Sequence, residues 1–560
     1  MEEKIQKAVQ GALADMGAGD VAFAIGRPNG VSFGDYATNA ALVAAKQLGK
    51  NPRELAEQLA DTLRSSTTLG PTSIAAIEVA GPGFVNITLA REAVALAVAE
   101  AEVQGSEWGK GTASSGVRTI VEYGNPNAFK EMHIGHLVGT VVGESVARLI
   151  ENAGATLARD TFGGDIGPNV AKALWGLQKA GVTEPSATDL GTAYAAGSNA
   201  YDTDETAKVE IDALNQAIYA GSDAALMDLW RRGREVSMEE FRRIWKLLGT
   251  HFDFEFFDSD TTETGLRVVK DGLEKGVFEM SDGAVIYNGE KKGVHTMVFI
   301  TSHNTPTYEA KDIGLAFLKE ERWPSDKVII VTGNEQTGRF RTVLSALAEL
   351  APNLAAKMEH LATGFLKLTS GKMSSREGNV VTAADFITSV VEKTSEKNAD
   401  PLVAEQVAVG AIKYMILRQA PGSDIIFDEA KSLSLEGDSG PYLQYALVRA
   451  KSVVAKTDET NSSKGMIYHT SSTKHSDEAY VLERITLHFP EVAARAASSR
   501  APNLLVNYLT ELAGEWNAFY AKERIIGGEH EAHKLLVARA FINTMTNGLT
   551  LLGIPTPERM

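Results

Sequence analysis

Two histidines carry the clearest chemical signal in this 560-residue chain. His133 and His136 are three positions apart at the predicted start of a helix, so both imidazoles share one face. Gly135 between them leaves the backbone open to a flat ring. A helix start attracts phosphate through its free N–H groups and its positive dipole end. These features predict a nucleotide site in which both imidazoles stabilise charge on a phosphate under attack. The alternative is a helix start with two surface histidines.

A second run, residues 371–379, combines cations and hydroxyls in a glycine-flanked loop. Such a loop can close on a triphosphate and stabilise the leaving pyrophosphate. Alone the signal is weak, because basic serine-rich loops are common. Its position after the histidine pair, in a Rossmann-like frame, makes it specific. The residues expected to contact ATP are Lys372, Met373, Ser374, Ser375 and Arg376.

The elements that must position these residues follow a strand–helix–strand order. Residues 118–123 form a β-rich run, 124–132 a loop, 134–153 a helical pattern and 156–162 a second strand pattern. This order predicts a parallel βαβ unit. Residues 327–331 form another buried-strand run. Ligands bind beyond the carboxyl ends of strands in such sheets, which is where the histidines stand.

The flanking segments differ in pattern from this sheet region. Helical spacing at 4–16, 36–48 and 53–63 and strands at 74–79 and 84–89 predict a small α/β unit, and the segment from about 440 onward has an all-helical pattern. We therefore predict three domains: 1–110, then 117–435 with a helical insertion at about 169–255, then 436–560.

Composition excludes several classes of protein and site. The net charge of −17 argues against non-specific coating of nucleic acid. A basic helix face is still a candidate contact surface, although a solvated charged face explains it equally well. The absence of cysteine excludes disulfides and cysteine-ligated zinc, and no apolar stretch predicts a membrane span. The residues of the candidate basic face are Arg231, Arg232, Arg234, Arg242, Arg243 and Lys246.

Taken together, the histidine run and the cationic loop resemble signatures of class I aminoacyl-tRNA synthetases. Residues 133–136 match the HIGH motif, and 372–376 resemble the KMSKS loop with Ser375-Arg376 in its last two places. Further segments are similar to the arginyl enzymes: 121–127 before the HIGH motif, 34–39 and 80–86 in their additional N-terminal domain, and 439–446 with 551–554 at the beginning and end of their anticodon-binding domain. The resemblance covers nearly the whole chain.

The resemblance implies roles for individual residues. Residues 305–312 are similar to the arginine-recognition helix, where Tyr308 and Asp312 point to one side and Asp312 reads the guanidinium. The remaining arginine contacts are expected from Glu122, Asn127, His133 and Gln336. Lys130 is expected to share neutralisation of the triphosphate with Lys372. Arg339 and Arg341 place two extra cations near a site for a cationic substrate, which would weaken arginine binding unless they face ATP or tRNA.

The implied fold is α/β: a Rossmann-like catalytic domain with a helical insertion, a small α/β N-terminal domain that contacts the tRNA elbow, and an all-α C-terminal anticodon-binding domain. The implied reaction is ATP-dependent attachment of L-arginine to tRNA(Arg) through an arginyl-adenylate, with release of AMP and pyrophosphate. ATP enters with Mg²⁺, and no protein-bound metal is expected. We also expect a cytoplasmic monomer with no membrane contact.

Three alternatives compete with this interpretation. The first is another class I synthetase, such as the cysteinyl or glutamyl type. The second is a tRNA-binding paralogue without catalysis, which has no chemical reason to retain the histidine pair and Lys372. The third is a small-molecule nucleotidyltransferase, which neither the length nor the helical C-terminal region favours.

Overall fold

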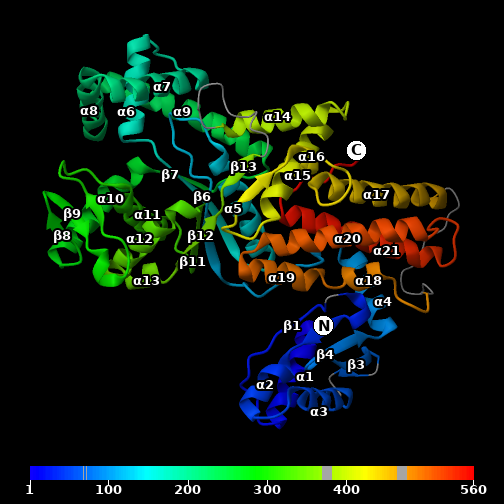
Figure 1. The fold of residues 1–560 in the computed structure, drawn as a ribbon. Coiled ribbons are helices and arrows are strands. Elements are labelled where there is room, and N and C mark those ends of the chain that lie inside the picture. The colour runs from blue at the N-terminus through cyan, green and yellow to red at the C-terminus, as the bar shows by residue number, and fades with distance from the viewer. Residues whose placement is uncertain (29, 67–68, 71, 369–380, 463–475) are drawn as a thin grey trace. The chain divides into compact units, whose positions relative to one another are not determined.

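The computed structural model describes the chain except for residues 29, 67–68, 71, 369–380 and 463–475 (Figure 1). The described residues form two compact units, each with hydrophobic cores of its own. The first unit comprises Met1–Lys110, Tyr445–Ala493 and Tyr508–Gly548. The second comprises Gly111–Gln444, Ala494–Asn507 and Leu549–Met560.

A five-stranded parallel sheet forms the centre of the second unit (Figure 1). Its order is β12-β11-β5-β6-β7, with bounds Met358–Thr363, Lys327–Gly333, Arg118–Glu122, Thr156–Gly163 and Phe254–Phe257. The central strand β11 has the sequence KVIIVTG, and its four apolar residues are buried. Such a continuous apolar run is typical of a parallel strand covered on both faces. The predicted strand–helix–strand unit is confirmed.

Helix α5 (Ile134–Asn152) connects β5 to β6 and begins with the histidine pair. His133 is its N-cap residue and forms a reciprocal capping box with His136. The helix lies very close to the residue that follows β5, because a Cβ added at Gly143 would stand 2.3 Å from the Cβ of Tyr123. Only glycine therefore permits this packing.

Two further groups of elements interrupt the sheet. Between β6 and β7 lie four helices, which form the predicted insertion: α6 (Pro168–Ala180), α7 (Ala187–Thr203), α8 (Glu205–Ala220) and α9 (Ala224–Leu247). Between β7 and β11 lie α10 (Asp258–Glu274), an antiparallel sheet of β8 (Glu279–Ser281), β9 (Ala284–Tyr287) and β10 (Met297–Ile300), and α11 (Tyr308–Arg322). The sequence did not predict this small sheet, because strands of three or four residues are too short to show a clear period.

The remaining elements of the second unit follow β11. They are α12 (Thr337–Leu350), α13 (Pro352–Ala355), β13 (Leu366–Leu368), α14 (Ala383–Ser395), α15 (Pro401–Leu417), β14 (Ile425–Phe427) and α16 (Glu429–Ser432). Strands β13 and β14 pair in parallel.

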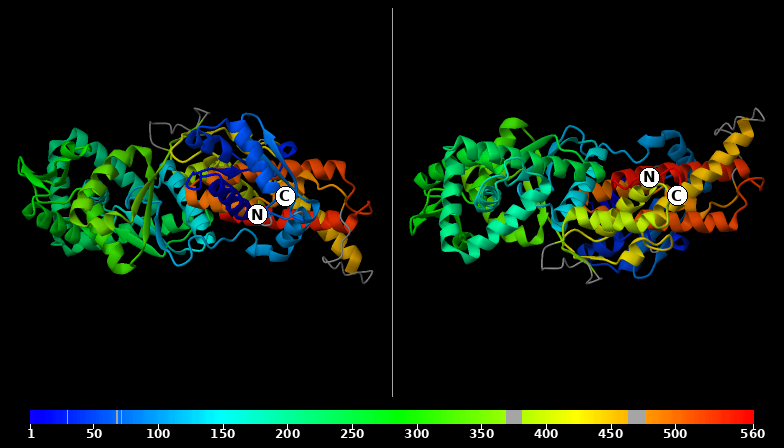
Figure 2. Two further views of the ribbon diagram at one scale, coloured as in Figure 1. Left: turned by 90° about the horizontal axis from the view of Figure 1, so that it is seen from below. Right: turned by 90° about the horizontal axis from the view of Figure 1, so that it is seen from above.

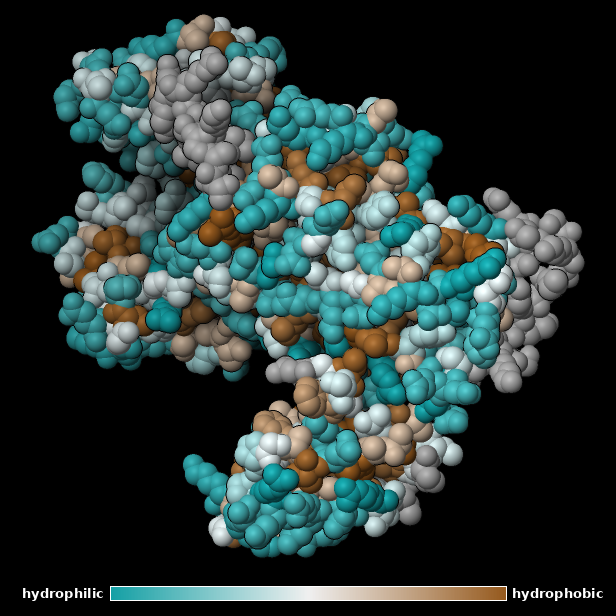
Figure 3. All heavy atoms as spheres, turned by 45° about the vertical axis from the view of Figure 1, so that its right-hand side comes forward, coloured by the Kyte–Doolittle hydropathy of each residue, from teal (hydrophilic) through white to brown (hydrophobic). Residues whose placement is uncertain are grey.

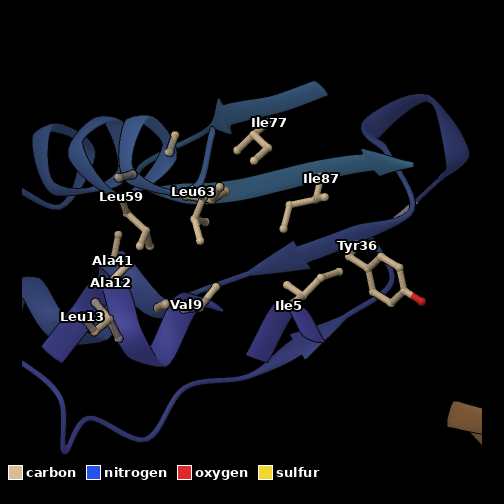
Figure 4. Packing of buried hydrophobic residues seen from close by; sticks show 14 of the residues in the cluster. Ile5, Val9, Ala12, Leu13, Tyr36, Ala41, Leu59, Leu63, Ile77 and Ile87 are labelled. Atoms are coloured by element: carbon tan, nitrogen blue, oxygen red, sulfur yellow. The ribbon is translucent and has the colours of Figure 1, made fainter. Parts of the chain in front are cut away.

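The first unit begins with a four-stranded antiparallel sheet in the order β1-β2-β4-β3. Its elements are α1 (Glu2–Asp15), β1 (Ile25–Gly26), β2 (Tyr36–Thr38), α2 (Ala40–Leu48), α3 (Pro52–Arg64), β3 (Ile74–Ala80), β4 (Phe84–Leu89) and α4 (Arg91–Gln104). Figure 4 shows Ile5 and Val9 of α1 pointing toward Leu63 and Ile87 across this core. The predicted helix 36–48 is wrong at its start. Residues Tyr36–Thr38 form an interior strand of the sheet, which pairs with β1 on one side and β4 on the other.

The C-terminal helices are α17 (Gly440–Ser462), α18 (Val481–Thr486), α19 (Phe489–Ser499), α20 (Pro502–Lys522) and α21 (Glu531–Leu551). In the first unit, α20 and α21 lie side by side in Figures 1 and 2. They pack together through Trp516 of α20, which stacks on Phe541 of α21 with ring centroids 4.7 Å apart. Arg449 of α17 lies 3.9 Å from the ring centroid of Tyr520. The predicted α/β fold with a helical insertion and a helical C-terminal region is confirmed.

Hydrophilic residues predominate on the face drawn in Figure 3, where hydrophobic residues form separate patches. Among the residues that the structure describes, no helix combines the length and apolar character required to cross a membrane.

Candidate active site

A cleft of about 550 Å³ lies at the carboxyl ends of β5, β6, β11 and β12. This is the edge at which open parallel sheets bind ligands. Most of the site residues predicted from the sequence come together in its lining, although they are spread along the chain. These are Glu122, Asn127, His133, Gly135, His136, Tyr308, Asp312 and Gln336.

The two histidines are held by backbone hydrogen bonds at the start of α5. The N–H of Gly135 donates to Nδ1 of His133 at 3.0 Å, and the N–H of His133 donates to Nδ1 of His136 at 3.3 Å. The rings are stacked, with centroids 3.7 Å apart and an interplanar angle of 27°. Because each Nδ1 is an acceptor, a neutral ring carries its proton on Nε2.

Both imidazoles are neutral near pH 7. Burial lowers the pKa of His133, and the charge of Lys130 lowers it further. Burial also lowers the pKa of His136 to about 3, with His133 and Lys130 adding to the shift. The pair therefore offers two Nε2–H donors without a positive charge, which suits hydrogen bonding to phosphate oxygens.

Glu122 lies at the end of β5 and already has two partners from the chain. It accepts a hydrogen bond from Nδ2 of Asn125 at 2.8 Å and pairs with the ammonium of Lys319. Lys319 also lies 2.8 Å from Asp160. Burial disfavours the charge on Lys319, but Asp160 and Glu122 together outweigh it and raise its pKa. Burial raises the pKa of Asp160 to about 7, despite the neighbouring ammonium.

Asp312 lies one turn into α11 and pairs with Arg339 of α12. Nη1 of Arg339 donates to Oδ2 of Asp312, and its Nε donates to Oε1 of Gln336 at 2.9 Å. Burial raises the pKa of Asp312 to about 7, against the lowering effect of Arg339. The sequence identified Arg339 as an extra cation, but this pairing was not predictable from spacing.

Asp258 lines the cleft from the first residue of α10 and forms a buried ion pair with Lys311 at 2.8 Å. Burial raises the pKa of Asp258 to about 6, although Lys311 acts in the opposite direction. The sequence missed Asp258, Asn125 and Glu335, all of which line the cleft. Their one available signal was their position just after a strand.

Lys130 does not belong to this lining. Its ammonium lies 5.2 Å from the ring centroid of Tyr194 on α7, so a contact with the insertion holds it. The predicted loop residues Lys372, Met373, Ser374, Ser375 and Arg376 lie outside the described residues.

Of the described segments on either side of residues 369–380, one lines the cleft and the other contacts His133, which lines it too. Residues 364–366 line it. On the other side, Thr382 forms a β-bridge with His133, and the N–H of Ala383 donates to the carbonyl of Met132 at 2.7 Å.

The candidate basic face on α9 is largely neutralised by its neighbours. Five of its arginines form ion pairs with carboxylates, which favours the solvated-face interpretation over a nucleic-acid contact. The pairs are Arg231–Asp228, Arg232–Glu184, Arg234–Asp165, Arg242–Glu255 and Arg243–Glu240.

Three known sequence families match the chain in succession. The family described as arginyl tRNA synthetase N terminal domain matches residues 3–89. The family described as tRNA synthetases class I (R), catalytic domain, matches residues 98–429. The family described as DALR anticodon binding domain matches residues 443–560.

Individual proteins match over most of their length. An arginine–tRNA ligase of Treponema denticola is 30% identical over 86% of this chain and 85% of its own. One of Flavobacterium psychrophilum is 31% identical over 79% of each chain. Among solved structures, the arginyl-tRNA synthetase of Thermus thermophilus is similar with a TM-score of 0.80, 25% identity and complete coverage of both chains.

Proposed function

Because the chain belongs to the class I arginyl-tRNA synthetases, we propose that the cleft at the carboxyl edge of its parallel sheet is where arginine and ATP react. The enzyme attaches L-arginine to tRNA(Arg). The observation that carries the assignment of the cleft is its lining, which combines two neutral histidine donors at a helix start with a carboxylate suited to a guanidinium.

In the first step, the carboxylate of arginine attacks the α-phosphate of ATP, giving arginyl-adenylate and pyrophosphate. We assign ATP, bound with Mg²⁺, to His133, Gly135 and His136 together with the loop residues 372–376. The Nε2–H groups of the two histidines would donate to phosphate oxygens as charge develops. Lys130 and Lys372 would share the neutralisation of the triphosphate.

In the second step, a terminal ribose hydroxyl of tRNA attacks the acyl carbon and releases AMP. Neither step requires a nucleophile from the protein, so catalysis depends on positioning and electrostatics.

We assign the arginine side chain to Asp312, with Gln336 and Tyr308 beside it. A planar cation with five N–H donors needs acceptors of this kind. Asn127, His133 and Glu122 are assigned to the amino and carboxyl ends. For Glu122 this means that the substrate ammonium shares a carboxylate with Lys319.

The division of labour follows the three domains. We propose that 1–110 contacts the tRNA elbow, that 117–435 catalyses both steps, and that 436–560 binds the anticodon. The three family matches support this order along the chain. We further propose a cytoplasmic monomer, in keeping with a chain that has no cysteine.

An aminoacylation assay tests the assignment of Asp312. Asp312→Asn should raise the KM for arginine by about tenfold to a hundredfold, the effect expected from losing a charged hydrogen bond, and should leave the KM for ATP unchanged. Glu321→Gln is the matched control, because Glu321 is an exposed carboxylate on the same helix.

The same assay tests the function as a whole. With total tRNA and each amino acid in turn, arginine alone should become attached to tRNA. Attachment of no amino acid would favour the tRNA-binding paralogue without catalysis. An unchanged arginine KM in Asp312→Asn would remove that residue from the guanidinium site.

A further inference from the structure

Arg339 is the one permanent cation among the cleft-lining residues that the structure describes. It lies in the first turn of α12, and its guanidinium is within 4.6 Å of the ring centroid of Phe340. It donates to Asp312 through Nη1 and to Gln336 through Nε. These two side chains are the ones assigned above to the guanidinium of the substrate. The chain's own guanidinium thus makes the contacts expected of arginine.

Two guanidinium groups at Asp312 would repel each other more than the two cations at Glu122, because Lys319 also pairs with Asp160, whereas Arg339 forms its salt bridge with Asp312. The side chain of Asp312 is only 10% exposed, so little water is present to screen two cations at one carboxylate. The amide oxygen of Gln336 accepts from Nε of Arg339, so a second guanidinium that used its other lone pair would lie close to the first. The side chain of Arg339 is 21% exposed and faces the cleft, so it has room to move away.

We propose that Arg339 is an exchangeable occupant of the guanidinium subsite, which pairs with Asp312 before arginine binds and which substrate arginine displaces. The proposal rests on the proposed function, because it takes Asp312 and Gln336 as the residues that read the substrate. Exchange of one guanidinium for another means that Asp312 is never buried as an unpaired carboxylate. The displaced Arg339 remains in a cleft that also binds ATP, where phosphate oxygens offer it strong acceptors.

The surroundings of Asp312 make this exchange sensitive to pH. The charged groups that shift the titration of Asp312 are Arg339 of α12, Glu122 of β5 and Glu309 of α11. Tyr308, Asp258 and Glu335 are among the titratable groups that line the same cleft. Burial, Glu122 and Glu309 all raise the pKa of Asp312, whereas Arg339 lowers it. Removal of Arg339 therefore takes away an influence that lowers this pKa and favours the protonated acid.

Arg339→Gln should consequently have opposite effects at high and at neutral pH. At pH 9, the end of the range that most favours the ionised form of Asp312, its internal competitor is gone, so arginine should bind at least about threefold more tightly than to the wild type. As the pH falls, Asp312 protonates in the variant, and arginine must displace a proton. Between pH 9 and the wild-type pKa of about 7, the variant should then lose up to about tenfold in affinity per pH unit relative to the wild type.

Calorimetric titration of the full chain with L-arginine, from pH 6.5 to 9, measures this. The ratio of the two dissociation constants at each pH cancels the titration of arginine itself. Arg341→Gln is the matched control, because Arg341 is an exposed arginine on the same helix. It should follow the wild type at every pH.

Two further variants keep the outcome decisive. Arg339→Lys retains the charge but cannot bridge both acceptors, so it should also bind arginine more tightly than the wild type at pH 9, and it serves if Arg339→Gln does not fold. Weaker arginine binding at every pH in both Arg339→Gln and Arg339→Lys would overturn the exchange. Arg339 would then be a residue that positions Asp312 for the substrate. Asp312→Asn separates this from failure of the proposed function: if it binds arginine like the wild type, the assignment of the subsite itself is wrong.

Discussion

Glu144 is the buried anchor of the helix that carries the histidine pair, and its replacement by glutamine should destabilise the second unit. The residue is 2% exposed, and its carboxylate accepts four hydrogen bonds. The donors are Nε of Arg148 at 2.6 Å, the hydroxyl of Tyr123 at 2.5 Å, the hydroxyl of Thr250 at 2.7 Å and Nε of Arg159 at 3.2 Å. These contacts connect α5 to the residue after β5, to β6 and to the segment after α9.

The magnitude follows from what the amide of glutamine cannot do. The amide has the same shape as the carboxylate of glutamate but only one accepting oxygen. Its NH₂ group must therefore face one of the four donors, to which it cannot form a hydrogen bond as an acceptor. Arg159 is 7% exposed and would keep only the more exposed Glu151 as a charged partner. Removal of one partner of a buried ion pair costs about 3–5 kcal/mol. Because Arg148 is 26% exposed and can turn to water, we expect a loss near the lower end, about 3 kcal/mol.

The pH dependence of this loss has a definite sign. Burial raises the pKa of Glu144, but Arg148, Arg159 and the hydrogen bonds outweigh it, so the pKa lies below its ordinary value of 4.5. A carboxylate with a depressed folded-state pKa stabilises the fold above the unfolded value and loses that contribution as the pH falls through the folded value. The gap between wild type and Glu144→Gln should be full at pH 7 and narrow below pH 4.5.

Urea unfolding followed by tryptophan fluorescence and circular dichroism measures the gap. Because the chain has two units, each transition must be fitted separately. Glu239→Gln, which changes an exposed glutamate on α9, is the control and should alter stability by less than about 0.5 kcal/mol. A loss below about 1 kcal/mol for Glu144→Gln, or a gap that stays constant down to pH 4, would refute the reasoning.

Three further predictions concern packing, a buried amine and the reaction. Gly143→Ala should lower stability in thermal melts by about 1–3 kcal/mol, because its Cβ would overlap Tyr123; Gly11→Ala, where the added Cβ meets nothing within 4 Å, should not. Burial lowers the pKa of Lys413 from 10.5 to about 7. Between pH 7 and 10.5 the unfolded chain therefore binds more protons than the folded chain. The free energy of unfolding of the wild type should rise with pH over that range, by up to about 1.4 kcal/mol per pH unit. Urea unfolding at pH 7, 8 and 9 should show that Lys413→Met lacks this rise. His136→Ala should slow pyrophosphate exchange by about a hundredfold with little change in the KM for arginine, and an equal change in both would argue against its assignment to the phosphate.

The histidine pair and the strands around it could be predicted because their signals are local. A capping position, a glycine and an apolar run each act within a few residues, and β5, α5 and β6 follow from them. The strand at Tyr36–Thr38 could not be predicted in the same way. Its short apolar sequence also fits the helix that follows, and only pairing with β1 and β4 distinguishes the two.

The ion pairs of the cleft were beyond prediction for a different reason. Glu122 and Lys319 are 197 positions apart, and Asp258 and Lys311 are 53 apart. No period or spacing relates such partners, because the fold alone brings them together. The sequence could identify an unusual cation near the substrate site, as it did for Arg339, but it could not name the carboxylate that the cation binds.

A cleft for a cationic substrate needs carboxylates, and neighbouring carboxylates repel each other unless cations balance their negative charges. The chain supplies these cations at different depths. Lys319 and Lys311 have side chains that are 1% and 4% exposed, so removal of either would leave a charge buried without a partner. Arg339 is 21% exposed and lies at the cleft surface, where substrate and water can replace it. Burial thus separates the lysines, which hold the site together, from the arginine, which can give way to the substrate.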